Sequence, residues 1–361
     1  MSTFIPAARP LIGEEERSAV DRVLQSGMMA QGPEVAAFES EFSAIVADRP
    51  CIAVNSGTSG LHMALIAAGI KQGDEVIVPS FTFAATANTV ALTGAIPVFV
   101  DIDPQTFNIN PLLIEAAITP RTRAIQPVHL YGQPAAMNEI MAIAARHNLL
   151  VIEDAAQAHM ATLEGRPVGS FGIAGVFSFY PTKNMTSGEG GMISTATNEV
   201  ARQCRLLRNQ GMEKRYENEI VGFNTRMTDI HAAIGRVQLA KLSGWTAQRR
   251  RNAKFFDENL KNVIVPYVAP SAVHVYHQYT IRIPGNSRDE FALEMTKRGV
   301  GNGVYYPIPV HKLESFGLKM ELPETTRACK EVLSIPVHPS LSQGELETIV
   351  SVINSIAGAG A

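Results

Sequence analysis

The chain has 361 residues, enough for about two domains, and 46% of them are hydrophobic, which excludes a disordered chain and a small scaffold held by disulfides. Its 31 basic and 34 acidic residues give a net charge of -3, so we expect no nucleic-acid partner. Residues 1–10 lack the apolar run of a secretory signal, and nowhere do 18 apolar residues stand in a row, so we expect a cytoplasmic protein without a membrane partner. The three cysteines stand far apart, so we expect neither a disulfide framework nor a metal site.

The first predicted elements are two amphipathic helices. Glutamates at residues 14–16 suit the positive end of a helix dipole, and apolar residues at helical spacing follow them as far as Gly27. After a loop at residues 28–33, a second apolar stripe runs over residues 35–45.

Between residues 50 and 200 the pattern changes to short strands separated by helices. The helical stretches, such as 60–69 and 137–147, are long enough to connect parallel strands. The pattern therefore predicts an α/β fold with a mostly parallel central sheet. Six apolar or β-branched runs are the expected strands: residues 51–54, 76–79, 97–100, 124–128, 149–152 and 176–180.

A smaller α/β domain is expected after this sheet. A helix should begin near Thr228, and the polar, basic stretch 248–254 follows Trp245. We place the domain junction there, which gives a large domain at residues 1–245 and a C-terminal domain at residues 246–361. Beyond the junction the pattern predicts a strand and two helices, at residues 276–283, 288–298 and 344–356.

The residues that follow the predicted strands are the first candidates for function, because ligands bind beyond the carboxyl ends of parallel strands. Residues 55–60 bring glycine, serine and threonine to the start of a helix, where backbone amides suit a phosphate, although a plain turn with an N-cap has the same pattern. Phe83 follows the second strand, where its ring could stack on a planar ligand or belong to the core.

Two further strand ends carry titratable groups. Asp154, Gln157 and His159 follow the fifth strand, and a carboxylate buried there needs a cation or a protonated nitrogen as its partner. His159 can equally be a structural histidine. Lys183 follows the sixth strand, where desolvation would lower its pKa and free its amine for nucleophilic chemistry.

Taken in chain order, these segments resemble the DegT/DnrJ/EryC1/StrS family of sugar aminotransferases, which have the type I fold of the enzymes that depend on pyridoxal 5′-phosphate (PLP). The resemblance covers almost the whole chain. Two positions depart from the family pattern, since Met160 stands where glycine is usual and Met28 where tryptophan is frequent. The motifs that carry the resemblance are residues 12–16, 26–27, 31–33, 55–59, 79–88, 153–159, 177–184, 188–191, 208–211, 222–229 and 305–311.

The resemblance implies a PLP site. Lys183 would bind the cofactor as a Schiff base and move the substrate proton, while Asp154 would pair with the protonated pyridine nitrogen. Gln157 would approach the ring hydroxyl and Phe83 would stack on the ring. The phosphate would be held by Gly57, Thr58, Ser178 and, from the other subunit of a homodimer, Asn224.

The same resemblance implies transfer of an amino group, from L-glutamate, to the keto group of a sugar linked to a nucleotide. Two alternatives stay open: a PLP-dependent lyase, dehydratase or aromatizing enzyme acting on a cyclic keto compound, and a PLP-binding regulatory protein without turnover. Lys183 argues against the dehydratases, in which histidine replaces the lysine. The candidate substrate residues are Met28, Met29, His159, Tyr306 and His311.

Overall fold

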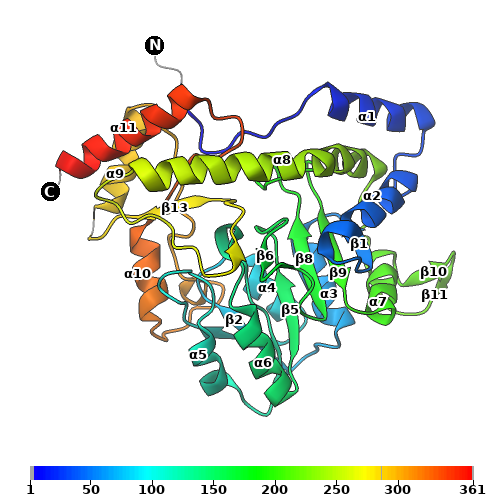
Figure 1. The fold of residues 1–361 in the computed structure, drawn as a ribbon. Coiled ribbons are helices and arrows are strands. Elements are labelled where there is room, and N and C mark those ends of the chain that lie inside the picture. Colours follow the sequence, from blue (N-terminus) through cyan, green and yellow to red (C-terminus); the bar gives the residue numbers. More distant parts are fainter. Residues whose placement is uncertain (1–3, 286, 360–361) are drawn as a thin grey trace.

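The computed structural model describes residues 4–285 and 287–359, and their centre is a seven-stranded sheet (Figure 1). Strand β9 runs antiparallel to both of its neighbours, whereas the other neighbouring strands of this sheet are parallel. The predicted α/β fold with a mostly parallel sheet is therefore confirmed. In spatial order the strands are β1 (Cys51–Val54), β9 (Gly191–Thr195), β8 (Ala174–Ser178), β5 (Leu150–Asp154), β4 (Thr122–Ile125), β2 (Glu75–Pro79) and β3 (Ile96–Val100).

Helices cover both faces of the sheet, because central strands such as β2 are apolar on both sides. In β2, Val76 and Val78 belong to one core cluster, whereas Ile77 between them belongs to another on the opposite face. On the first face lie α3 (Gly57–Ala67), α4 (Ala85–Leu92) and α7 (Asn198–Arg208), and on the second α2 (Pro33–Ser43), α5 (Pro111–Ile114) and α6 (Met137–His147).

Helix α8 (Asp229–Asn259) crosses the molecule above the sheet, and α1 (Glu14–Ser26) packs along it (Figure 1). The buried carboxylate of Glu16 fastens the two helices, since its Oε1 accepts hydrogen bonds from Gln238 Nε2 at 2.7 Å and Lys241 Nζ at 2.8 Å. Both N-terminal helices were predicted.

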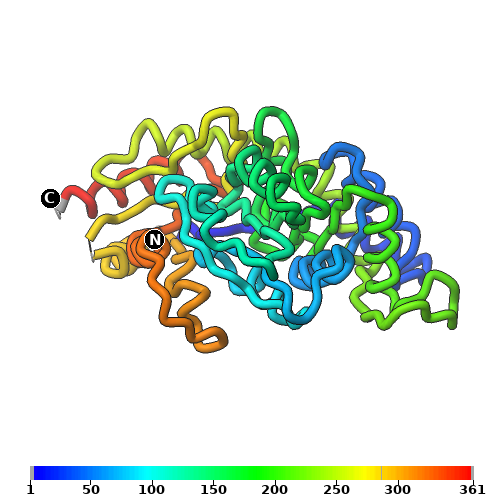
Figure 2. The backbone as a smooth tube through the Cα atoms, turned by 90° about the horizontal axis from the view of Figure 1, so that it is seen from below, coloured from blue at the N-terminus to red at the C-terminus, as the bar shows by residue number. Residues whose placement is uncertain are grey.

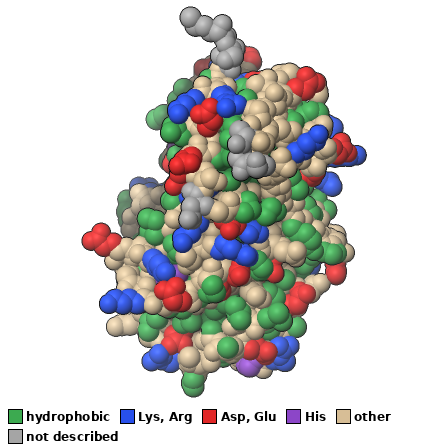
Figure 3. Space-filling model, turned by 90° about the vertical axis from the view of Figure 1, so that its left-hand side faces the viewer, with side chains coloured by type: hydrophobic (Ala, Val, Ile, Leu, Met, Phe, Trp, Pro, Cys, Tyr) green, Lys and Arg blue, Asp and Glu red, His purple; other side chains and the backbone are tan. Residues whose placement is uncertain are grey.

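The C-terminal part of the chain forms a second core at one end of the molecule, opposite the hairpin of β10 and β11 (Figures 1 and 2). On the face shown in Figure 3, basic and acidic side chains are interspersed. In the part of the chain that is described, no helix has both the length and the apolarity that a membrane crossing needs. The elements of this part are β13 (Tyr279–Arg282), α9 (Arg288–Lys297), α10 (Pro323–Glu331), β14 (Val332–Ile335) and α11 (Gln343–Ala359).

Short elements complete the fold. Beside the main sheet lie β6 (Thr162–Leu163), β7 (Arg166–Pro167) and β12 (Ala272–Val273), with the hairpin strands β10 (Met212–Lys214) and β11 (Glu217–Asn218) and the 3₁₀ turns η1 (Ala44–Val46), η2 (Glu115–Ala117), η3 (Leu130–Gly132) and η4 (Val310–Lys312).

The proposed domain junction falls within a helix. Helix α8 continues without a break past residue 245. Within the polar stretch 248–254, Asn252 and Ala253 are buried, and Ala253 packs in the C-terminal core. Ile5, near the start of the chain, packs in the same core. The division at residue 245 therefore stays a prediction, and a boundary placed there would cut a continuous helix.

Candidate active site

A cavity of about 480 Å³ lies at the carboxyl ends of β2, β5 and β8. This position is the one that the parallel topology favours for a ligand. The cavity brings together residues from distant parts of the chain, including most of the predicted cofactor ligands. Among its lining residues are Gly57, Thr58, Phe83, Asp154, Gln157, Ser178, Lys183 and Tyr306.

The start of α3 forms one end of the cavity. Ser56 caps this helix, and its hydroxyl accepts a hydrogen bond from the Ser59 backbone amide at 3.1 Å. Gly57 lies so close to Ser178 at the end of β8 that an added Cβ would stand 2.9 Å from the Ser178 Cβ. Glycine thus lets the positive end of the α3 dipole reach the cavity, where it suits an anion.

Asp154 ends β5 at the cavity wall and is 5% exposed. Its Oδ2 accepts a hydrogen bond from the Thr86 hydroxyl at 2.8 Å, and its Oδ1 accepts one from the Ala156 amide at 3.2 Å. Burial raises the pKa of this carboxyl, while these hydrogen bonds and the charge of Lys183 act in the opposite direction. A ligand with a protonated nitrogen would therefore stabilise the ionised form.

Lys183 follows β8 in a turn that is closed by a hydrogen bond from its backbone amide to the Tyr180 carbonyl at 2.9 Å. Burial lowers the pKa of the amine to about 8, although the charge of Asp154 opposes the shift. About one amine in ten is then neutral at pH 7, far more than for an exposed lysine.

Gln157 connects the sheet to the C-terminal part of the chain. Its Oε1 accepts a hydrogen bond from the Tyr131 backbone amide at 2.8 Å, and its Nε2 donates to the Tyr306 hydroxyl at 2.9 Å. The Tyr131 hydroxyl in turn donates to the Tyr305 carbonyl. The ring of Phe83, 58% exposed, lies with its centroid 6.0 Å from that of Tyr306. An aromatic face is thus open to the cavity.

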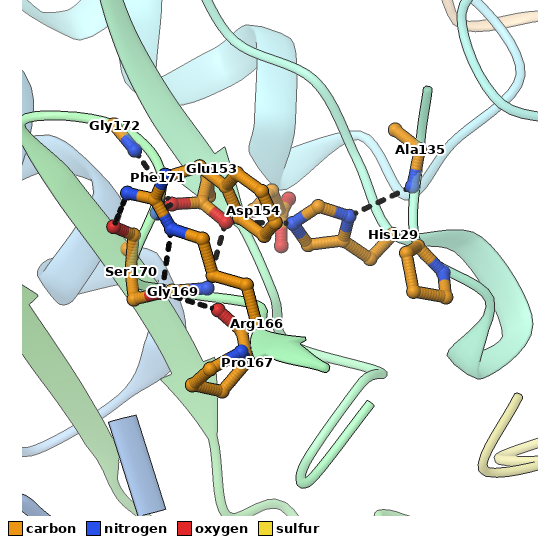
Figure 4. Close-up of polar contacts among 12 residues, drawn as sticks. His129, Ala135, Glu153, Asp154, Arg166, Pro167, Gly169, Ser170, Phe171 and Gly172 are labelled. Atoms are coloured by element: carbon orange, nitrogen blue, oxygen red, sulfur yellow. Dashed lines mark hydrogen bonds and ion pairs between the residues drawn. The ribbon is translucent and has the colours of Figure 1, made fainter. Parts of the chain in front are cut away.

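Glu153 points away from Asp154, as alternation along β5 requires, and anchors the end of the strand (Figure 4). Its carboxylate accepts backbone hydrogen bonds from Gly169, Phe171 and Gly172 at 2.7 to 2.8 Å. The His129 Nε2 lies 3.1 Å from Glu153 Oε2.

The protonation of His129 follows from its second contact (Figure 4). Its Nδ1 accepts a hydrogen bond from the Ala135 amide at 3.0 Å, and because an amide only donates, the ring proton must be on Nε2, facing Glu153. This network fixes the end of the strand that carries Asp154.

Two predicted substrate histidines lie outside the cavity lining. His159 is buried with its ring centroid 5.5 Å from that of Phe177 and 5.8 Å from that of Phe179, and burial lowers its pKa to about 3. His311 has its Nδ1 2.6 Å from the Ser80 hydroxyl and donates from Nε2 to the Met320 carbonyl at 3.1 Å. Neither histidine lines the cavity of this chain, so a contact of either ring with the substrate stays a prediction.

Three other predicted residues are also outside the cavity lining. Met28 and Met29 are 54% and 51% exposed, in a loop that Asp229 fastens by accepting a hydrogen bond from the Gly32 amide at 2.8 Å. Asn224 lies beside the end of α7, where it pairs with Asn209 as an isolated β-bridge. A single chain does not bring these side chains to the cavity.

Other lining residues were not predicted. Thr82 and Tyr180 follow strands β2 and β8, so the strand-end rule could have found them. His277 and Gln278 come from the C-terminal part of the chain, and no local pattern indicates that they reach the sheet.

The chain is similar to aminotransferases both in sequence and in structure. The profile of the DegT/DnrJ/EryC1/StrS aminotransferase family matches residues 10–354. The chain is 44% identical over 344 residues to the pleiotropic regulatory protein of Geobacillus stearothermophilus, covering 92% of each chain, and 40% identical over 368 residues to GDP-perosamine synthase of Caulobacter vibrioides, covering 98% of each. The crystal structure of S. venezuelae DesV in complex with a ketimine intermediate superimposes with a TM-score of 0.93 at 38% identity, covering 98% of this chain and 99% of that one.

Proposed function

The chain belongs to the DegT/DnrJ/EryC1/StrS aminotransferase family, and from this premise we propose that it transfers the amino group of L-glutamate to the keto group of a nucleotide-linked sugar. It is a PLP-dependent aminotransferase with relatives in amino sugar biosynthesis. The observation that carries the proposal is the cavity in which Lys183 and Asp154 face the start of α3.

The cavity fits PLP on three counts. Asp154 is a buried carboxylate that needs a protonated nitrogen, which the pyridine ring supplies. The amides at the start of α3, with Thr58 and the Ser178 hydroxyl, suit a phosphate, and the room for it depends on the missing side chain of Gly57. Lys183 lines the same cavity with an amine whose pKa burial has lowered to about 8.

The side chains that line the cavity have different roles in the proposed reaction. When bound, the cofactor supplies an electron sink for the charge that develops on the substrate carbon. Asp154 keeps the proton on the pyridine nitrogen. The neutral amine of Lys183 takes the proton from the substrate carbon and returns it. Gln157, whose Oε1 accepts a hydrogen bond from the Tyr131 amide, would donate its remaining N–H to the ring hydroxyl, and Phe83 would support the ring.

The nucleotide-linked sugar is supported by the relatives. The Caulobacter vibrioides protein is by name a GDP-perosamine synthase, and the family is one of sugar aminotransferases. A second candidate, a PLP-binding regulator without turnover, is favoured by one observation, the name of the Geobacillus stearothermophilus relative.

We further propose that the active site is shared between two copies of the chain. Asn224 is a phosphate ligand in this proposal, yet it does not line the cavity of its own chain. The polar loop that carries it would serve the cavity of the partner subunit.

A single half-reaction distinguishes transaminase from regulator. PLP-loaded protein mixed with L-glutamate should release about one equivalent of 2-oxoglutarate per subunit, and the aminated protein should then convert a keto sugar nucleotide to its amino sugar. The Lys183→Ala protein is the control. Binding of PLP without any 2-oxoglutarate would contradict catalysis and favour the regulator.

The attachment site is tested separately. Borohydride reduction of the PLP-loaded protein and peptide mapping should place the pyridoxyl group on Lys183. Recovery of the label on Lys214 or Lys241 instead would refute the assignment.

A further inference from the structure

A buried threonine holds the carboxylate of Asp154 from behind the cavity. Thr86 lies in the first turn of α4, is fully buried, and is not among the cavity-lining residues. Its hydroxyl is nevertheless 2.8 Å from Asp154 Oδ2, although the two residues are 68 positions apart in the chain. The contact is thus made by the packing of α4 on the sheet.

The direction of the hydrogen bonds is fixed by proton counting. A hydroxyl has one proton to donate, and an ionised carboxylate can only accept, so Thr86 must donate to Asp154. The Thr82 hydroxyl lies 2.9 Å from the Thr86 hydroxyl and must therefore donate to it. Thr82 itself lines the cavity, so a short hydroxyl chain runs from the cavity wall to the back of Asp154.

The backbone of Thr86 is held as firmly as its side chain. Its carbonyl accepts hydrogen bonds from Gln126 Nε2 at 2.9 Å and from the Thr89 hydroxyl at 3.2 Å. Since these partners are buried too, the hydroxyl of Thr86 has a fixed position relative to β5.

Of the groups that face Asp154, Thr86 has the largest effect in favour of ionisation. Burial raises the pKa of Asp154, and the Thr86 hydrogen bond is the strongest of the interactions that lower it, ahead of the Ala156 amide and the charge of Lys183. The phenol of Tyr306 approaches from the C-terminal part, and α4 itself carries no titratable side chain.

We propose that Thr86 is a positioning residue for transamination, whose hydroxyl keeps the Asp154 carboxylate ionised and oriented toward the cavity. This inference rests on the proposed function of Asp154 as the partner of the pyridine nitrogen. Thr86 would act only through Asp154, because it is fully buried behind the cavity.

The test compares Thr86→Val, which loses the hydroxyl at nearly constant volume, with Thr86→Ser, which restores it. Thr195→Val is the matched control, since Thr195 is equally buried but lies in β9 and hydrogen-bonds only to the backbone carbonyls of Pro50 and Thr197. In the cofactor-free protein, infrared pH titration follows the protonated carboxyl band that is absent from Asp154→Asn. The midpoint of the Asp154 titration should rise in Thr86→Val and stay at the wild-type value in Thr86→Ser and Thr195→Val.

A second readout follows the reaction. The rate of the glutamate half-reaction should fall about tenfold in Thr86→Val, because a hydrogen bond to a charged group is lost, and Thr86→Ser should recover most of it. If Thr86→Val does not fold, Thr86→Ala replaces it. An unchanged Asp154 midpoint in a folded variant that lacks the hydroxyl overturns the inference. If Asp154→Asn keeps the wild-type rate of the half-reaction, the proposed function of Asp154 is wrong. The Thr86 variants thus test the role of Thr86, and the Asp154 variant tests the role of Asp154.

Discussion

Burial favours the neutral form of both Lys183 and Asp154, and it therefore shifts their pKa values in opposite directions. Desolvation lowers the pKa of the lysine and raises that of the carboxyl, while the charge of each group partly opposes the shift of the other. The neutral amine and the ionised carboxylate are both needed in the proposed mechanism. The amine therefore depends on burial, and the carboxylate depends on its hydrogen bonds.

The first prediction concerns the reactivity of the lysine. In the cofactor-free protein, the rate at which a small amine-selective reagent modifies Lys183 should increase with pH, with a midpoint at about pH 8. Peptide mapping identifies the modified lysine. Asp154→Asn should move the midpoint down, because it removes the negative charge that favours the protonated amine. Lys241, whose pKa is raised by Glu15 and Glu16, is the internal control and should react only at higher pH. Equal profiles for the two lysines would rule out a desolvated Lys183.

The second prediction concerns stability. Because the pKa of Lys183 is lower in the folded protein, the unfolded chain binds more protons between about pH 8 and pH 10.5, so the free energy of unfolding should rise with pH through this window. At pH 7 the cost of the buried charge is on the order of 3 kcal/mol at most. Cofactor-free Lys183→Met should then be more stable than wild type at pH 7, with the difference shrinking above pH 10. Denaturant titrations at the two pH values measure the difference in unfolding free energy between the variant and wild type. If this difference does not change with pH, it comes from packing and not from the buried charge.

At the scale of elements, the end of each strand determines which side chains reach the cavity. Parallel strands bring Asp154 and the Lys183 turn to the same edge, and for this reason the sequence alone could predict that they lie close together. Strand β9 was missed because it begins at Gly191, and glycine is unfavourable in a strand. The structure gives the reason for this glycine: an added Cβ would stand 2.7 Å from the Ser56 backbone, so glycine permits the close approach of β9 to the start of α3.

Other contacts at the site depend on packing between distant segments. Thr86 reaches Asp154 only because α4 packs against the sheet, and Tyr306 meets Gln157 across 149 positions of sequence. Helix α10 and strand β14 were not predicted, and β14 pairs with β13 far earlier in the chain. Periodicity describes one segment at a time and cannot supply such pairings.

The third prediction compares two glycines within α8. At Gly235 an added Cβ would stand 2.7 Å from the buried Phe38 ring of α2, whereas at Gly244 nothing lies within 4 Å. Gly244→Ala should stabilise the protein by roughly 0.5–1 kcal/mol, because alanine is the better helix former. Gly235→Ala should instead cost about 1–3 kcal/mol through overpacking. Denaturant unfolding with saturating PLP in both samples gives the two values, and stabilisation by both would exclude a tight contact between α2 and α8.

At the scale of the whole molecule, one chain leaves several expected site residues outside its own cavity. Asn224 lies beside α7, and Met28 and Met29 are exposed in the loop before α2. A second copy related by two-fold symmetry would place the same loop at both cavities. The shared site that we propose thus depends on an assembly, which sedimentation or light scattering should detect as a dimer.

The last prediction tests whether Asn224 acts across that dimer. In a mixed dimer of Lys183→Ala and Asn224→Ala chains, both defects fall in one site if Asn224 acts in trans, and the other site is intact. After subunit exchange of equal amounts, roughly a quarter of all sites should therefore be intact. The assay uses limiting PLP, because losing one charge-assisted hydrogen bond, about 1.5–3 kcal/mol, weakens cofactor binding more than it affects turnover. Mixing Lys183→Ala with the double variant gives the background, since no intact site can form. If the mixture of single variants has only the average activity of the two parents while mixed dimers are present, Asn224 does not act across the interface and the site is not shared through it.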